Sequence, residues 1–404
     1  MDKSGSIVAT HSKVAVTVAK MRGLNREAFP ILRDNVYFDV AYKASVPASV
    51  RAAVMSYFDE NQSSAGDKVA WARRIEKLRA SAAKLIGANA DEIAFVKNTS
   101  EGINLFVHSI DFRSGDNVVI SDQEHAANLY PWTNLNRMGV EVRCVKSRDY
   151  TFNTDDIIAL IDSRTRAVAL SLVCQISGFI PDVAAVAEFC RPRGIKVFLD
   201  AMQAVGAIPV RVKELGIDGL ATSGHKWLLG PYGTGFIYAD REFAASTVPV
   251  FASKHYTRIE LDDPNTSLLS DAGKWEYGSL NYPGLCGLAA GIEMILELDA
   301  LKISTQIENL IRILRDRAKS VGLHSITPDD RTLGVSGIIS FACPNADEVT
   351  TFLRAQKIFV SSRRGMLRVS LHFYNDEEDI ERFIAMLPRD LAVPADHREA
   401  QHGT

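Results

Sequence analysis

The chain has 404 residues, more than one compact core of ordinary size holds, so a large domain with a smaller companion is expected. Its 46 Lys and Arg against 49 Asp and Glu give a formal net charge of −3, which provides no overall attraction to nucleic acid or to an anionic membrane. Hydrophobic residues at 47% and charged residues at 24% exclude wholesale disorder, collagen and a coiled-coil rod.

The cysteines and the N-terminus indicate the compartment. Five cysteines form no CxxC pair, and such a sparse, odd set suits a reducing compartment better than a disulfide framework or a structural zinc site. The N-terminus lacks a long apolar core followed by a small-residue cleavage site, and no run reaches the roughly 18 apolar residues of a membrane span. The sequence therefore predicts a cytoplasmic protein with no metal, no membrane partner and no nucleic-acid partner.

The elements up to residue 283 predict one α/β domain. Residues 1–34 are polar and weakly patterned, and we expect an arm that packs on the body or on a partner subunit. Residues 35–283 contain several apolar runs that are continuous rather than alternating, separated by helix-compatible segments such as 182–191, which indicates a mostly parallel seven-stranded sheet. The predicted strands are 93–96, 117–120, 141–145, 167–173, 196–199, 220–223 and 235–238.

The remaining chain predicts a small C-terminal α/β domain. Within residues 284–393, apolar side chains at three- and four-residue spacing from Gly284 to Ser320 predict a helical bridge between the two domains. Residues 394–404 are expected to form a frayed tail. The predicted strands of the small domain are 335–342, 358–363 and 366–373, and its predicted helices are 346–355 and 376–387.

Two polar residues follow predicted strands at the edge where open α/β sheets bind ligands. Asp200 ends one strand, where it suits either a buried ion pair or a helix cap. Lys226 lies between a strand end and the glycine-rich turn 230–235, and a lysine held away from bulk water is nucleophilic, as a Schiff-base amine must be. The glycines lack the GK[ST] ending of a Walker A loop, and GxSxG is absent, which disfavours nucleotide-phosphate binding and serine hydrolysis.

The motif SGHKW at 223–227, with DAMQ at 200–203 upstream, resembles the class V aminotransferase family of fold type I pyridoxal-phosphate (PLP) enzymes. This group includes cysteine desulfurases and isopenicillin N epimerase, and the likeness covers roughly residues 35–390. The resemblance implies PLP as the cofactor and Lys226 as its Schiff-base lysine. It also implies that Asp200 pairs with the pyridinium nitrogen and that Gln203 contacts the ring hydroxyl.

The same resemblance assigns further cofactor residues. It places His125 over the cofactor ring, which makes His125, Lys226 and Asp200 the catalytic set. Ser279 matches a loop that reaches the phosphate of the neighbouring subunit, which implies a homodimer with shared active sites. Judged without the resemblance, His125 suits an ordinary loop histidine and the turn at Thr99 suits a helix N-cap. The residues that match the family's phosphate cradle are Thr99, Ser100, Ser223 and His225.

Near the C-terminus, residues 362–375 resemble the segment whose arginine forks onto a substrate α-carboxylate. Arg368 takes that role, with Arg363 and Arg364 as the alternatives, although adjacent arginines on a loop are more often solvated. Two departures from the family pattern indicate an altered substrate pocket. Gln175 stands where many relatives have Asn, and Tyr42 replaces a small residue.

Desulfurases of this family carry a reactive cysteine on a mobile loop before the carboxylate-binding arginine. Residues 359–368 contain no cysteine and leave no room for a long loop, and Cys343 nearby suits a small hydrophobic residue. The resemblance is therefore to the isopenicillin N epimerase-like branch, and persulfide chemistry is disfavoured.

The resemblance implies an enzyme that acts on an amino acid or an amino-acid S-conjugate through an external aldimine and a quinonoid, with C–S β-elimination favoured. Transamination, decarboxylation and epimerisation use the same residues and remain alternative reactions. The sequence also does not determine the substrate side chain, the pathway or whether O2 oxidises the quinonoid. A non-catalytic PLP-fold binding protein is the alternative from another class, disfavoured because Lys226, Asp200, His125 and Arg368 are all retained. A Rossmann dehydrogenase is disfavoured because no GxGxxG follows the first strand.

Overall fold

The computed structural model describes residues 26–251, 253, 269–329 and 332–388. The expected arm, residues 1–34, is described only from residue 26 onward. The expected tail, residues 394–404, lies outside the described residues.

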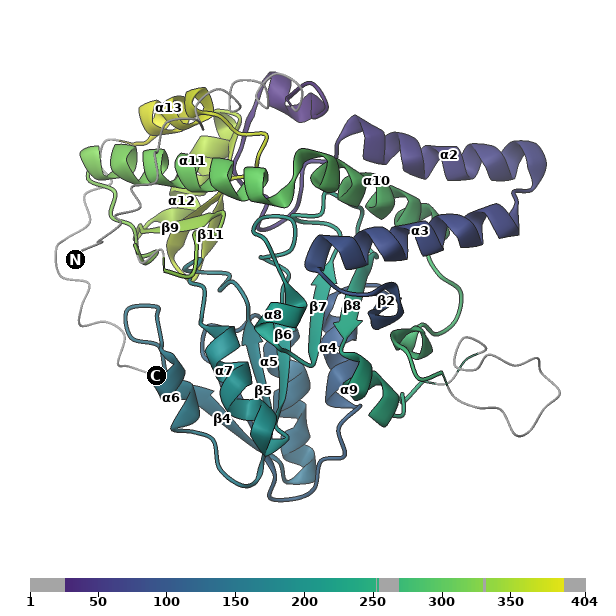
Figure 1. Cartoon of the computed structure of the whole chain (residues 1–404). Helices are drawn as coiled ribbons and strands as arrows, with labels where there is room; N and C mark the ends of the chain where they lie inside the picture. The colour runs from purple at the N-terminus through teal and green to yellow at the C-terminus, as the bar shows by residue number, and fades with distance from the viewer. Residues whose placement is uncertain (1–25, 252, 254–268, 330–331, 389–404) are drawn as a thin grey trace, which may run out of the picture.

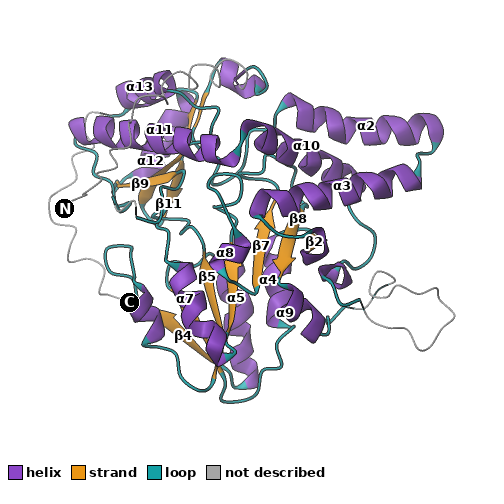
Figure 2. Ribbon diagram, in the orientation of Figure 1, coloured by secondary structure: helices purple, strands orange, loops and turns teal. Residues whose placement is uncertain are grey.

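The large domain is built on a seven-stranded mixed sheet with the strand order β2-β8-β7-β6-β5-β3-β4 (Figure 2). All seven predicted strands are present, and β5 is the one most displaced, because it begins and ends two residues before the predicted run. In this sheet β8 runs antiparallel to both neighbours and the other pairs are parallel, so the mostly parallel sheet is confirmed. The strands are β2 Ile93–Val96, β3 Asn117–Ser121, β4 Glu141–Val145, β5 Thr165–Ser171, β6 Lys196–Asp200, β7 Gly219–Ser223 and β8 Gly235–Ala239.

Helices cover both faces of the sheet, which is why its strands are apolar on both sides. Along β5, Val168 and Leu170 point into one hydrophobic cluster, which they share with α7 (Val183–Cys190). Ala167 and Ala169 point into a second cluster with α4 (Thr99–Val107) and α5 (Ala126–Thr133). The shorter helices are α6 Thr154–Ile158, α8 Val212–Leu215, α9 Arg241–Ser246 and the 3-10 turns η1 Pro30–Arg33, η2 Ala90–Glu92, η3 Asn134–Met138, η4 Arg191–Arg193 and η6 Ala272–Trp275.

Three long helices form a layer beside the sheet (Figure 1). They are α2 (Ala48–Ser64), α3 (Lys68–Ile86) and α10 (Tyr282–Leu298), and the first two have no counterpart among the predicted elements. The predicted bridge from Gly284 to Ser320 is two helices rather than one. Asp299, with φ of 73°, ends α10, and its carboxylate then accepts the Leu301 N–H at 2.8 Å to cap α11 (Ala300–Ser320).

The small domain contains a three-stranded sheet in the order β11-β12-β9. Its strands are β9 (Ile338–Ala342), β11 (Ser361–Arg363) and β12 (Met366–Ser370), and its helices are α12 (Ala346–Ala355) and α13 (Glu377–Met386). A separate strand, β10 (Ile358–Phe359), pairs in parallel with β1 (Val36–Tyr37). Residues 36–37, which the sequence-based division places in the large domain, thus pair with a strand of the small one.

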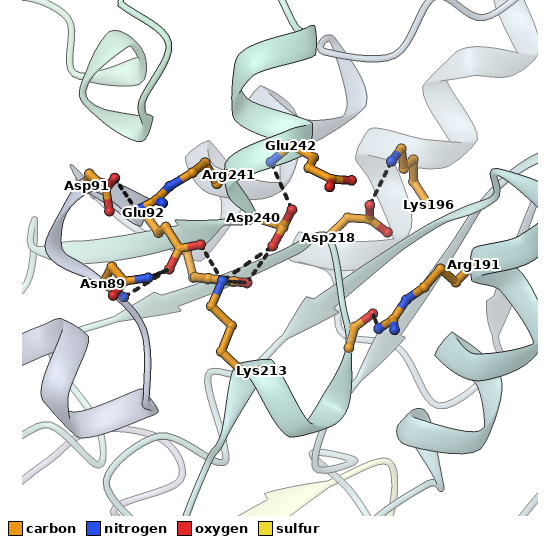
Figure 3. A network of polar contacts seen from close by, with 12 residues as sticks. Asn89, Asp91, Glu92, Arg191, Lys196, Lys213, Asp218, Asp240, Arg241 and Glu242 are labelled. Atoms are coloured by element: carbon orange, nitrogen blue, oxygen red, sulfur yellow. Dashed lines mark hydrogen bonds and ion pairs between the residues drawn. The ribbon is translucent and has the colours of Figure 1, made fainter.

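A network of polar contacts lies at the end of the large sheet opposite Asp200 (Figure 3). Lys213 of α8 donates to the carboxylate of Glu92, whose side chain is only 1% exposed, and its Nζ lies 3.4 Å from Oδ2 of Asp240. The backbone and side-chain N–H groups of Asn89 donate to the second oxygen of Glu92 at 2.9 and 3.0 Å. The buried acid is therefore neutralised by one cation.

In the described part of the chain, no helix is long and apolar enough to cross a membrane.

Candidate active site

A cavity of about 750 Å³ lies beyond the carboxyl ends of β6 and β7, at the edge of the sheet where ligands were expected. It gathers residues from both domains. Of the predicted site residues, the cavity is lined by Tyr42, Thr99, Ser100, His125, Gln175, Asp200, Gln203, Ser223, His225, Lys226, Arg363 and Arg368. Ser279 is the predicted site residue that does not line it.

Lys226 follows β7 and shares this cavity with Asp200, which ends the neighbouring strand β6. Burial, assisted by the positive charge of Arg368, lowers the pKa of Lys226 to about 8 from 10.5, and the charge of Asp200 opposes that shift. Burial raises the pKa of Asp200, and its Oδ1 accepts the Met202 N–H at 2.9 Å. A neutral amine is thus accessible near physiological pH, as the sequence predicts for Lys226.

The backbone that carries Lys226 is tightly enclosed. The buried Trp227 donates its indole N–H to Oε1 of Gln203 at 2.7 Å, and its carbonyl oxygen lies 3.1 Å from Nε2 of His372. Glycines from three separate segments lie against the same stretch. A Cβ at Gly206 would overlap the Trp227 carbonyl, one at Gly291 of α10 would overlap the Leu228 carbonyl, and one at Gly337 would overlap the Trp227 ring.

The N-terminus of α4 is a candidate anion site at the cavity wall. The Thr99 N–H donates to Oγ of Ser223 at 2.7 Å, and the two side-chain hydroxyls lie 2.9 Å apart. His225 stacks on Tyr232 with a centroid separation of 4.1 Å, and its Nδ1 is buried without a partner among the described residues. Burial and the Lys226 charge lower the pKa of His225 to about 4, so its ring is neutral. A buried imidazole nitrogen without a partner and the N-terminus of α4 contribute to the same cavity, and together they fit a phosphate group.

His125 caps α5. Its Nδ1 accepts the Ala127 N–H at 3.0 Å, so the neutral ring carries its proton on Nε2. Burial, and secondarily the Lys226 charge, lower the pKa of His125 to about 4. The neutral ring can therefore stack on a cofactor or donate one hydrogen bond from Nε2.

Glu124, directly before His125, is a cavity residue absent from the predicted set. Its carboxylate accepts from Oγ of Ser121 at 2.6 Å, Nδ2 of Asn128 at 2.7 Å, and both Oγ and N of Ser171 at 2.6 and 3.0 Å. It ties β3, β5 and α5 together next to His125. The signal in the sequence is an acid that precedes a histidine at a strand end, with Asn four residues later.

Arg368 of β12 is only 1% exposed and lies at the base of the cavity. Its guanidinium donates to the backbone carbonyl of Gln175 at 3.0 Å and to Oγ of Ser361 at 3.1 Å. Oδ1 of Asp39 lies 3.9 Å from its Nη2, and burial raises the pKa of Asp39. Asp39 was not predicted, although it lies three residues before Tyr42. Gln175 thus orients Arg368 through its backbone.

The hairpin between β11 and β12 turns through only two residues, Arg364 and Gly365, with φ of 48° and 73°. The chain therefore has no long loop between Arg363 and Arg368. Cys343 is buried, its thiol donates to Oδ1 of Asn345 at 3.4 Å, and burial raises its pKa. Cys343 has the surroundings of an inert thiol.

Ser279 lies in a separate hollow of about 50 Å³, which Glu101 of α4 also lines. Its neighbour Tyr277 donates its hydroxyl to Glu101 of that helix, and Lys97 donates to the same hydroxyl at 3.3 Å. The segment 275–279 is therefore fixed to the helix at whose N-terminus the candidate anion site lies, but Ser279 does not line the cavity that contains Lys226.

The fold and the cavity define a class of protein. A mixed seven-stranded sheet with a small C-terminal sheet is the α/β architecture of the fold type I PLP enzymes. The residues also fit PLP by their chemistry, because one cavity offers an anion site, a buried acid for a ring nitrogen and a buried amine for an aldehyde.

Comparisons with known proteins identify the family. The aminotransferase class-V family profile matches residues 36–383. A probable cysteine desulfurase of Methanothermobacter thermautotrophicus is 30% identical over 382 residues, which cover 88% of this chain and 94% of that protein. The chain therefore belongs to the aminotransferase class-V family.

Solved structures agree with this assignment. The apo structure of a cysteine desulfurase from Thermococcus onnurineus is 27% identical, with a TM-score of 0.81, covering 89% of this chain and 96% of that one. The cystine C-S lyase C-DES, solved with its product cysteine persulfide, is 21% identical with a TM-score of 0.83, covering 90% and 99%, and at that identity the likeness concerns the fold.

Proposed function

We propose that the protein is a PLP-dependent enzyme that cleaves a C–S bond by β-elimination from an amino acid or an amino-acid S-conjugate. The observation that carries the proposal is the meeting of Lys226, Asp200 and Arg368 in one cavity. These three residues provide a proton-transfer amine, an acid for the cofactor ring and a fork for a carboxylate. PLP, when bound, supplies an electron-withdrawing ring that stabilises negative charge developing at the substrate Cα.

The chain's own residues position the cofactor and the substrate. Thr99, Ser100, Ser223 and His225 would hold the phosphate, with Gln203 beside the ring and His125 over its face. Asp200 would keep a proton on the ring nitrogen. Arg368, already oriented by Ser361 and the Gln175 carbonyl, binds the α-carboxylate. The amine of Lys226, neutral above a pH of about 8, would remove the proton from Cα as the Cβ–S bond breaks. The sulfur would leave with the electron pair of that bond, and the ammonium form of Lys226 would return the proton to it.

Cysteine desulfurase activity is the second candidate, favoured by the names of the relatives at 30% identity. The two-residue turn at Arg364 and the buried state of Cys343 argue against a persulfide on an internal cysteine. A lyase that releases its sulfur product to solution needs no such residue. We also propose that the chain belongs to the isopenicillin N epimerase-like branch of the family, because residues 359–368 contain no cysteine.

We also propose a homodimer, because the cavity lacks the Ser279 contribution that a neighbouring subunit would supply. Exposed apolar side chains on and before α2, at Val46, Met55 and Phe58, are available for such a contact. A cytoplasmic location stays a prediction.

The first experiment tests the cofactor. The purified protein should be yellow, and borohydride should bleach its absorbance band and leave a pyridoxyl group on the Lys226 peptide. Lys226→Ala should lose the label, whereas the matched variant at an exposed lysine, Lys302→Ala, should keep it. A protein that takes up no PLP would refute the proposal.

The second experiment tests the reaction. The holoenzyme is mixed with cysteine, cystine, other amino acids and cysteine S-conjugates, and pyruvate, thiol or persulfide, CO2 and amino-group transfer are followed separately. Equal amounts of pyruvate and sulfur product establish the lyase. Alanine from cysteine establishes the desulfurase, accumulation of pyridoxamine phosphate establishes transamination, and no turnover of any compound favours the non-catalytic alternative.

A further inference from the structure

The β11–β12 hairpin places three arginines at the same cavity. In its register Ser361 pairs with Arg368 and Arg363 pairs with Met366. Because side chains alternate along a strand, Arg363 lies on the same face of the hairpin as Arg368, as its diagonal neighbour about 7–8 Å away. Arg364 follows in the turn and also lines the cavity.

Arg368 is equipped for a single carboxylate. Its N–H groups already bind Ser361 and the Gln175 carbonyl, and Asp39 at 3.9 Å balances part of its charge. An α-carboxylate needs one such fork. Binding of the α-carboxylate of an amino acid therefore does not require Arg363 or Arg364.

Neither Arg363 nor Arg364 has a carboxylate partner in the part of the chain that the structure describes. The two acids on the cavity wall are engaged elsewhere. Glu124 is surrounded by hydrogen-bond donors, and Asp200 accepts from the Met202 backbone and faces Lys226. One carboxylate, that of Asp39, is shared electrostatically between Arg368 and Arg363. The three arginines of the hairpin therefore leave an excess of positive charge at the cavity.

Arg363 has an aromatic partner at the cavity, and Arg364 has an unusual backbone conformation. The Arg363 guanidinium lies over the ring of Tyr42, 5.5 Å from its centroid, and a guanidinium on an aromatic face keeps its edge available for a carboxylate. Arg364 occupies the left-handed region with φ of 48°, where a two-residue hairpin turn favours Asn or Gly. Arginine at this position is unfavourable for the turn itself, and such strain is typical of functional sites.

We infer that Arg363 and Arg364, with Tyr42, form a second anion subsite, and that the substrate is an amino-acid conjugate that carries a carboxylate remote from its α-carbon. The amino-acid end of this substrate rests on the proposed function. The second subsite rests on the unpaired arginines of the hairpin.

Two isosteric compounds test the subsite: S-(2-carboxyethyl)-L-cysteine and S-(2-carbamoylethyl)-L-cysteine, which differ by one negative charge. Their dissociation constants from the holoenzyme are measured by absorbance titration, and kcat/KM is measured by thiol release. The wild type should favour the acid by about tenfold or more, the increment of one charge-assisted contact. Arg363→Gln combined with Arg364→Gln should bring this ratio near unity with little change for the amide, and Arg363→Lys should retain part of it.

Two further variants are controls. Arg193→Gln removes one positive charge before β6, at the end of that strand opposite Asp200, and should leave the ratio unchanged. Arg368→Gln should weaken both compounds equally. If Arg363→Gln also weakens both equally, Arg363 belongs to the α-carboxylate site and the inference is wrong. A wild-type ratio near unity also overturns it.

Failure of the proposed function is recognised separately. If neither cysteine conjugate binds, calorimetric titration of the holoenzyme with glutarate and glutaramate tests the subsite without an amino group. A preference for glutarate that disappears in the double variant supports the subsite. In that case only the proposal that the substrate is an amino-acid conjugate is wrong. Equal binding, or no binding, of these two compounds overturns the subsite itself.

Discussion

The depressed pKa of Lys226 makes the rate of PLP uptake by the apoenzyme depend on pH in a defined way. The free amine attacks the aldehyde only when it is neutral, and its pKa is about 8 rather than 10.5. The difference of about 2.5 means that at pH 7 about 300-fold more of this amine is neutral than of an exposed lysine. Uptake should therefore rise with pH and level off above about 8.

Two substitutions should move this midpoint in opposite directions. Asp200→Asn removes the anion that favours the ammonium form, so the midpoint should fall. Arg368→Gln removes a cation that disfavours the ammonium form, so the midpoint should rise. His125 and His225 are neutral throughout the range because their pKa values are about 4, and they do not contribute to the change.

The assay is borohydride trapping of the initial rate between pH 6 and 10, counted as pyridoxyl peptide. Parallel reaction of PLP with Nα-acetyl-lysine corrects for the ionisation of PLP itself. A wild-type midpoint above about 10, or a shift of both variants in the same direction, would refute the reasoning.

Three further outcomes follow from contacts in the structure. Lys213→Met leaves the Glu92 carboxylate buried without its cation and should lower the free energy of unfolding by about 1–3 kcal/mol in denaturant titration. This range is smaller than for a fully buried ion pair because the Lys213 side chain is 43% exposed. The control Lys302→Met should leave the free energy of unfolding unchanged. Glu124→Gln turns an amide NH2 toward groups that themselves donate and should cost about 1–3 kcal/mol by the same measurement; no loss would mean that the contacts are not formed. Cys343→Ser should keep kcat for sulfur release within about twofold, and complete loss would identify Cys343 as a nucleophile.

Most strands of the large sheet were predictable because burial on both faces leaves continuous apolar runs that few other structures produce. The edge strand β4 is the exception, because Glu141 is exposed and the next three residues are half-buried. The long helices were less predictable from the sequence. In α2 only Val50 is fully buried, so the helix has no apolar stripe to read. In α3 the stripe exists, at Trp71, Ile75, Leu78 and Leu85, and was not recognised. The break at Asp299 depends on one backbone angle that periodicity does not report.

The site residues carried by short motifs, such as Lys226 and Asp200, were predicted with their place in the fold, and the structure brings them together. Asp39 was missed because its partner Arg368 lies in the other domain. Glu124 was missed although two of its partners, Ser121 and Asn128, lie three and four residues away in the sequence. A contact between residues as far apart in the sequence as Asp39 and Arg368 leaves no local pattern in a single sequence.

The glycines around Trp227 and Leu228 limit how this protein can change. Alanine at Gly291 would suit the helix by propensity, yet its methyl group would overlap the Leu228 carbonyl and displace the adjoining peptide. Gly206 and Gly337 impose the same restriction from two other directions. Random mutagenesis should therefore find these three positions intolerant even of the smallest side chain, although none of them reaches the reacting molecule.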